Sequence, residues 1–229
     1  MTRIRYRFTT ALALAGLVAI FALQPIGATM AQSATAALLA QPMSLPDMAL
    51  GEAKAPVTIF EFASMSCPHC AAFEQNVFPM LRSKYIDTGK VRYVFREFPL
   101  DIKAASASVL ARCIANGDAE KFFGAIDTMF KQQDALMEQT KETMLAIGKD
   151  AGLDDKGVES CVGDQSAMDR LSADETFAAK QLKVDATPTF FINGKMVKGA
   201  ISVLEELLTD EPADNGQLVA PDGADSLKE

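Results

Sequence analysis

Histidine is almost absent from this chain, and the only one, His69, lies inside a Cys-x-x-Cys motif. Metal sites built from several histidines are therefore excluded. Cysteine is also scarce, because Cys113 and Cys161 are the only two outside the motif and are not spaced as a second pair. A structural zinc ion commonly takes two such pairs, or one pair with histidines. The scarcity of ligands predicts no metal and favours redox chemistry for the motif.

The chain also lacks an apolar run of the length that a membrane span needs. Three arginines in the first seven residues precede 13 mostly apolar residues, 11–23, whereas a spanning helix takes about 20. The small residues around Ala31 offer a cleavage site. This layout predicts that residues 1–31 are a secretory signal peptide, in preference to a membrane anchor.

Positive charge is in deficit, with 22 Lys and Arg against 30 Asp and Glu and a formal net charge of −8. Removal of residues 1–31 takes away three arginines and no acid, which leaves −11. Such an acidic protein is a poor partner for nucleic acid or anionic lipid. We expect a soluble monomer in an oxidising, extracytoplasmic space such as the periplasm, where cysteines form disulfides.

The hydrophobic pattern predicts an α/β protein. A β-branched run ends at Ala63, a helical pattern follows from Cys67, and alternation returns before Phe98. About 80 residues of helical pattern come next, and Asn193-Gly194 then separates two short strands, as in a type I′ hairpin. This order predicts a thioredoxin fold interrupted by an all-helical insertion domain. The expected segments are a flexible lead-in (32–50), a first half (51–100), the insertion (101–180), a second half (181–208) and an acidic disordered tail (209–229).

The reactive dithiol is assigned to Cys67 and Cys70. Cys67 is expected at the N-terminus of its helix, where free N–H groups and the helix dipole stabilise a thiolate. The ring of His69 can add a hydrogen bond or partial positive charge. Because a stabilised thiolate is a good leaving group, the disulfide form should oxidise other thiols. Cys70, one turn inside the helix, is expected to be the shielded, resolving thiol.

Two other readings of the motif are weaker. Covalent haem attachment needs a histidine directly after the second cysteine, and Ala71 stands there. A purely structural disulfide is disfavoured because so short a loop constrains the chain little. Cys113 and Cys161 are expected to form a structural disulfide, with two buried free thiols as the alternative.

Glu61 interrupts the apolar strand before the motif. A carboxyl group buried there would have a raised pKa and could carry a proton to or from Cys70. The alternative is an outward-facing strand residue. Pro188 precedes the returning strand, and local sequence alone favours an ordinary trans proline there.

The chain resembles the DsbA-like thiol:disulfide oxidoreductases of the thioredoxin superfamily. The resemblance is carried by three stretches, residues 55–70 with Cys-Pro-His-Cys, 95–100, and 186–194 with Ala-Thr-Pro-Thr-Phe-Phe. It implies that Cys67 is an exposed nucleophile and that Glu61 is the buried acid. It also implies that Thr187 and a cis-Pro188 bind the substrate chain.

The predicted function is therefore an exported dithiol oxidase that introduces disulfides through a mixed disulfide. Its expected partners are reduced or unfolded exported polypeptides and a membrane protein that reoxidises it. It should need no cofactor beyond the Cys67–Cys70 disulfide. The alternatives are a disulfide isomerase or reductase of the same fold and, from another class, a non-catalytic chaperone-like binding protein. A threonine at position 187 keeps the isomerase alternative open. The lead-in is too short to contain a dimerisation domain, which argues against that alternative.

Overall fold

The computed structural model describes residues 26–199, with side chains from residue 32 onward. Its centre is a five-stranded sheet of order β1-β3-β2-β4-β5. β2 and β3 run parallel, and the other neighbouring pairs are antiparallel. The strands are β1 (Met48–Leu50), β2 (Val57–Ala63), β3 (Val91–Glu97), β4 (Thr189–Ile192) and β5 (Lys195–Lys198).

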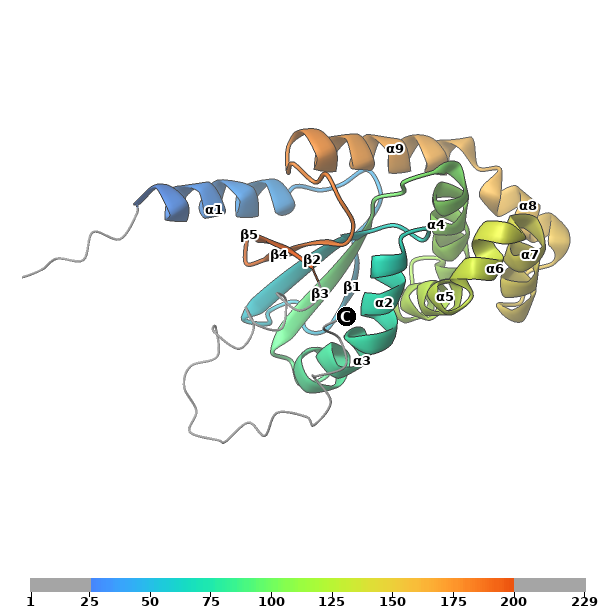
Figure 1. Cartoon of the computed structure of the whole chain (residues 1–229), viewed down its shortest axis with the longest axis horizontal. Helices are drawn as coiled ribbons and strands as arrows, with labels where there is room; N and C mark the ends of the chain where they lie inside the picture. Colours follow the sequence, from blue (N-terminus) through green and yellow to red (C-terminus); the bar gives the residue numbers. More distant parts are fainter. Residues whose placement is uncertain (1–25, 200–229) are drawn as a thin grey trace, which may run out of the picture.

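Helices cover both faces of this sheet, so its central strands β2, β3 and β4 bury side chains on both sides. On one face Ile59, Tyr93 and Phe190 pack under the helix that carries the dithiol. On the other, Phe62 and Phe191 pack under α1 and α9 (Figure 1). The helices are α1 (Ile26–Leu39), α2 (Pro68–Asn76), α3 (Phe78–Leu81), α4 (Ile102–Ala115), α5 (Ala119–Lys131), α6 (Gln133–Glu138), α7 (Thr140–Asp150), α8 (Asp155–Val162) and α9 (Gln165–Lys180), with a π-helical turn at Arg82–Ile86.

The six helices α4 to α9 lie between β3 and β4 in the chain, as an insertion into a thioredoxin fold requires (Figure 1). The insertion also packs on the sheet. Phe123 of α5 packs against Tyr93 and Phe95 at ring distances of 5.9 and 6.3 Å. At its end, Ala178 of α9 already belongs to the cluster on the opposite face of the sheet. The predicted fold class is confirmed, and the insertion shares its core with the sheet on both faces.

The expectation that residues 32–50 form a flexible lead-in is wrong. α1 continues to Leu39, and β1 pairs antiparallel with β3. Leu39 and Leu45 are at most 5% exposed, and Asp174 of α9 accepts hydrogen bonds from the backbone N–H groups of Ser44 and Leu45. The segment is ordered by contacts distant in sequence, which its own composition does not reveal.

The hairpin between β4 and β5 forms as predicted. Asn193 and Gly194 both have positive φ, 47° and 85°, as a type I′ turn requires. A Cβ on Gly194 would lie 2.7 Å from the carbonyl oxygen of Gln32 in α1, so glycine also lets α1 pack on the hairpin. The expected cleavage site at Ala31 falls within α1. The rest of the expected signal peptide, the helix after Ser202 and the tail lie outside the described residues.

Candidate redox site

Cys67 and Cys70 lie at the beginning of α2, at the end of the sheet where β2 and β3 finish. Cys67 is the N-cap, with φ −86° and ψ 117°, and Pro68 is the first helical residue. Proline fits there because the first N–H groups of a helix have no partner inside it. Both sulfurs are present as free thiols. The motif therefore occupies the predicted helix N-terminus.

The environment separates the acidities of the two thiols. The pKa of Cys67 is lowered to about 5, first by a hydrogen bond from the Cys70 thiol, against burial, and then by Thr187 and the backbone N–H groups of Cys70 and His69. The pKa of Cys70 is raised far above its ordinary value, first by burial and then by its hydrogen bond to Cys67. At neutral pH the reduced site therefore holds a thiolate on Cys67 and a thiol on Cys70.

The exposure of the thiols corrects one expectation. Cys67 is only 4% exposed, and Cys70 is fully buried. Cys67 is thus the more accessible sulfur but not an openly exposed nucleophile, because Thr187 lies over it. As a thiol its Sγ donates a hydrogen bond to the Thr187 carbonyl oxygen at 3.2 Å. The Thr187 hydroxyl is buried and has no partner among the described residues, so it can donate to the thiolate.

The peptide bond between Thr187 and Pro188 is cis, as the family resemblance implied and local sequence did not. The Thr187 carbonyl oxygen lies against Cys67, from a chain position 120 residues away. β4 begins directly after it at Thr189. The second half of the thioredoxin fold therefore supplies the backbone that faces the dithiol.

His69 is exposed, in contrast to the two thiols. Its backbone N–H group contributes to the low pKa of Cys67. The role predicted for its ring stays a prediction, because no described contact involves that ring.

Glu61 is fully buried on β2, which excludes the outward-facing alternative. Tyr93 on the neighbouring strand β3 donates a hydrogen bond to its Oε2. Burial raises the pKa of Glu61 to about 8, the Tyr93 hydroxyl partly offsets this, and the negative charge of Cys67 raises it further. At neutral pH the carboxyl group therefore holds a proton.

Three further residues of the site were not found from the sequence. Gln133, the first residue of α6, donates from Nε2 to the carbonyl oxygens of Met65 and Cys67 at 2.8 and 3.0 Å. Tyr93 and Glu74 lie in the same interior as Glu61. Strand alternation could have placed Tyr93 on this face, and helical spacing could have placed Glu74 beneath Cys70. No local signal marks Gln133.

Cys113 and Cys161 form a disulfide that joins α4 to α8, with their Cα atoms 5.9 Å apart. The predicted pairing is confirmed. Neither sulfur lies at the dithiol, so this bond belongs to the framework of the insertion.

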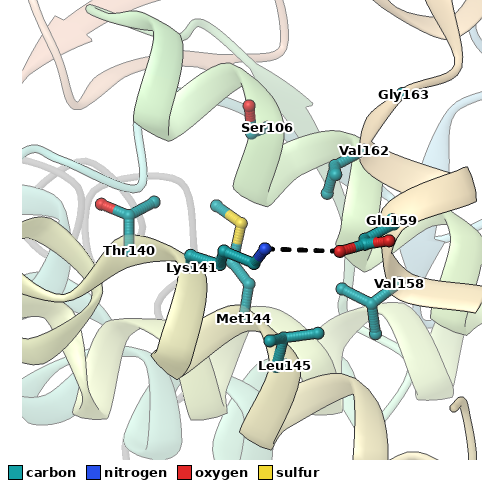
Figure 2. A pocket seen from close by; sticks show the side chains of 9 residues that line it. All are labelled: Ser106, Thr140, Lys141, Met144, Leu145, Val158, Glu159, Val162 and Gly163. Carbon is teal, nitrogen blue, oxygen red and sulfur yellow. Dashed lines mark ion pairs between the residues drawn. The ribbon is translucent and has the colours of Figure 1, made fainter. Parts of the chain in front are cut away.

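A largely apolar pocket of about 390 Å³ lies elsewhere in the insertion, between α4, α7 and α8. Figure 2 shows an ion pair of Lys141 with Glu159 across it, at 3.4 Å. Its lining residues are Ser106, Thr140, Lys141, Met144, Leu145, Val158, Glu159, Val162 and Gly163. None of the redox residues contributes to its lining.

The described residues also bear on the metal and membrane alternatives. Within residues 26–199, no three or more His, Cys, Asp or Glu side chains are grouped so as to hold a metal ion. In the same range no helix is both long and apolar enough to cross a bilayer.

Comparison with known proteins places this arrangement among redox proteins. A family model described as Thioredoxin matches residues 44–208. The crystal structure of alpha-DsbA1 from Wolbachia pipientis is similar to this chain, with 31% identity and a TM-score of 0.65, over 76% of this chain and 94% of that one.

Two curated relatives carry names that refer to the same thiol–disulfide chemistry. A protein of Rickettsia bellii, named "Putative protein-disulfide oxidoreductase", is 37% identical over 150 residues, 65% of this chain and 57% of its own length. "Probable disulfide bond formation protein D" of Bacillus cereus is 30% identical, over 71% of this chain and 77% of its own. The chain thus spans little more than half the length of the Rickettsia protein.

Proposed function

We propose that this chain, which belongs to the thioredoxin family, is a DsbA-like protein-disulfide oxidoreductase that works in the oxidising direction. It introduces disulfides into reduced polypeptides by dithiol–disulfide exchange. The observation that carries this proposal is the opposite perturbation of the two thiols. The pKa of Cys67 lies at about 5, whereas that of Cys70 is raised by burial.

This asymmetry favours the reduced form of the site. At neutral pH the Cys67 thiolate is stabilised only once the Cys67–Cys70 bond has opened. A disulfide whose reduced form is stabilised is a stronger oxidant, and a thiol of low pKa is a better leaving group. The same geometry directs attack to Cys67, because Cys70 is fully buried.

The reaction proceeds in two exchanges. A substrate thiolate attacks Sγ of Cys67, the Cys67–Cys70 bond breaks, and its electron pair leaves with Cys70. Glu61, which is protonated at neutral pH because its pKa is about 8, supplies the proton that Cys70 then holds. A second substrate thiolate attacks the substrate sulfur of the mixed disulfide and releases Cys67 as a thiolate. The substrate gains a disulfide, and the enzyme is reduced by two electrons.

Thr187 and Pro188 are the substrate-binding residues of this proposal. An extended chain bound beside Cys67 can pair with the backbone at Thr187, as peptides do when they extend a strand. The Thr187 hydroxyl is buried and Thr187 contributes to the low pKa of Cys67, so this hydroxyl can donate to the Cys67 thiolate when it leaves the mixed disulfide. The ring of His69 remains exposed to the incoming chain.

The proposed setting follows from the sequence. Residues 1–31 direct export to the periplasm, the substrates are reduced or unfolded exported polypeptides, and a membrane partner returns the dithiol to the disulfide. We propose that the protein acts as a monomer with no organic cofactor, metal or nucleic acid.

The deciding experiment is the reduction potential of Cys67–Cys70, measured by equilibrating residues 32–229 with glutathione buffers. An oxidase should lie near the oxidising end of the family, about −120 mV. A value near −270 mV, typical of thioredoxin, would assign the chain to a reductive pathway. The Cys67→Ala variant is the control. If this variant retained the full activity of the wild type, the chain would be a non-catalytic binding protein.

A further inference from the structure

A second pocket, of about 610 Å³, lies far from the dithiol and takes no residue from it. It is on the face of the sheet that α1 and α9 cover, since Leu39 and Phe60 belong both to its lining and to the apolar cluster of that face. Thr58 and Arg92, which also line it, stand near the beginnings of β2 and β3. The dithiol follows the end of β2, so the pocket and the thiols lie at opposite ends of the sheet.

The polar side of this pocket is made of hydrogen-bond donors from three strands. Thr58 on β2 and Arg92 on β3 are direct neighbours in the sheet register, so their side chains stand together on one face. Oδ1 of Asn193, directly after β4, accepts a hydrogen bond from the backbone N–H group of Thr58 at 3.0 Å. This leaves the N–H groups of the Asn193 amide for another partner. A guanidinium, a hydroxyl and an amide therefore line the same wall.

Arg92 brings a positive charge that the protein does not neutralise there. It is half-buried and has no hydrogen-bond or ion-pair partner among the residues that the structure describes. Asp47, the acid in the lining, is already paired with Arg96, whose Nε and Nη2 donate to it at 2.8 and 2.9 Å. Together the three groups carry one net positive charge, in a chain of formal net charge −8.

Arg96 lies against the same pocket and has a donor to spare. Its side chain is only 5% exposed. Its guanidinium stacks on the Phe60 ring at 4.5 Å, and Nη2 also donates to the Leu39 carbonyl oxygen at 2.8 Å. Its contacts Asp47, Phe60 and Leu39 all line the pocket, whereas Nη1 has no partner within the described part of the chain. Burial of an unpartnered cationic donor is costly, and an anion beside it offsets that cost.

The rest of the lining is apolar, which gives the pocket two different sides. The Phe60 ring and Leu39 form one part of it, and Ala36 and Ala40 of the α1 segment leave room because their side chains are small. One net positive charge suits a monoanion better than a phosphate, which carries nearly two charges at neutral pH. The planar fork of a guanidinium matches the two oxygens of a carboxylate. The volume is typical of pockets that hold small organic molecules.

We propose that this pocket binds a small monocarboxylate with an aromatic or branched apolar body. The carboxylate pairs with the Arg92 guanidinium and accepts a hydrogen bond from the Thr58 hydroxyl beside it. The apolar body lies against Phe60 and the small side chains of α1, so the ligand joins α1 to the sheet. The site is separate from the dithiol and does not depend on the direction of the redox reaction.

The test is a fluorescence titration of the full chain with indole-3-acetate, an aromatic monocarboxylate. The indole signal is free of protein background because the chain has no tryptophan. The dissociation constant should be about 1 mM or lower. Indole-3-acetamide has nearly the same shape without the charge, and it should bind at least about tenfold more weakly. Inorganic phosphate at equal concentration should not displace the probe, because it lacks the apolar body.

Three variants assign the binding to the pocket. Arg92→Gln removes its uncompensated charge and should weaken binding of indole-3-acetate at least about tenfold. Thr58→Val keeps the shape of the side chain without the hydroxyl and should weaken binding about fivefold. Arg170→Gln makes the first change at an exposed arginine of α9 outside this lining. It is the matched control and should bind as the wild type does.

Absence of binding, or equal binding of the acid and its amide, would overturn the proposal. Wild-type affinity in Arg92→Gln would overturn it too, because the probe would then bind elsewhere. Displacement by phosphate would show a general anion site and refute the assignment to carboxylates. Melting temperatures establish that the variants are folded, and Thr58→Val, which leaves every charge in place, decides the matter if Arg92→Gln does not fold.

Discussion

The reduced protein should lose stability as the pH falls, and the size of the loss follows from Cys67. An unfolded cysteine titrates near about 8.5, whereas the pKa of Cys67 in the folded, reduced protein is about 5. A group whose folded pKa is depressed contributes stability that is complete above its unfolded pKa and disappears as the pH falls through its folded pKa. The window therefore extends from about pH 8.5 down to below pH 5.

The full contribution is at most about 5 kcal/mol, since each pKa unit corresponds to about 1.4 kcal/mol. At pH 7 about 3 kcal/mol of it is present. For a two-electron couple this equals a shift of about 60 mV toward oxidising potential. Ionisation of Cys67 therefore supplies a large part, though not all, of the difference between a reductant and an oxidase.

The assay is urea unfolding of the reduced protein at a series of pH values, beside the Cys67→Ser variant, whose hydroxyl does not ionise. The difference in unfolding free energy between the two should shrink by several kcal/mol between about pH 8.5 and pH 4.5. Ultraviolet absorbance of the thiolate should locate the same transition. A difference that is constant with pH would refute the assignment of an ionised Cys67.

Three further outcomes are expected. Tyr93→Phe should raise the pKa of Glu61 above about 8, by about 1 to 2, because a hydrogen bond to a charged group stabilises it by about 1.5 to 3 kcal/mol; carboxyl NMR titration measures it. Gln133→Ala should lower the free energy of unfolding by about 1 kcal/mol, and Gln133→Glu by more, since a carboxylate would face two carbonyl oxygens. Replacing both Cys113 and Cys161 by alanine opens a 48-residue loop. It should cost up to about 4 kcal/mol of unfolding free energy and leave the dithiol potential unchanged.

Local sequence was sufficient wherever the chemistry is local. The N-cap position of Cys67 could be predicted from Pro68 and the apolar spacing that follows. The burial of Glu61 was suggested by its place within an apolar strand. The Asn193-Gly194 turn is specified by the two residues themselves, because few others accept positive φ.

Residues that act across the fold could not be predicted in the same way. Gln133 reaches the catalytic turn from a position 66 residues later in the chain, and nothing about a glutamine at a helix start indicates this. The cis bond before Pro188 could be predicted from the family resemblance alone. The order of the lead-in could not be predicted because Leu39 and Leu45 pack against residues that are distant in sequence.

The contact from Gln133 has a consequence for how this site can change over generations. Its amide holds the main-chain oxygens of Met65 and Cys67, which every amino acid provides. The exposed residues Pro68 and His69 can therefore be substituted without loss of these two hydrogen bonds. The redox strength of the dithiol is open to adjustment by single substitutions, while the scaffold that presents it stays fixed.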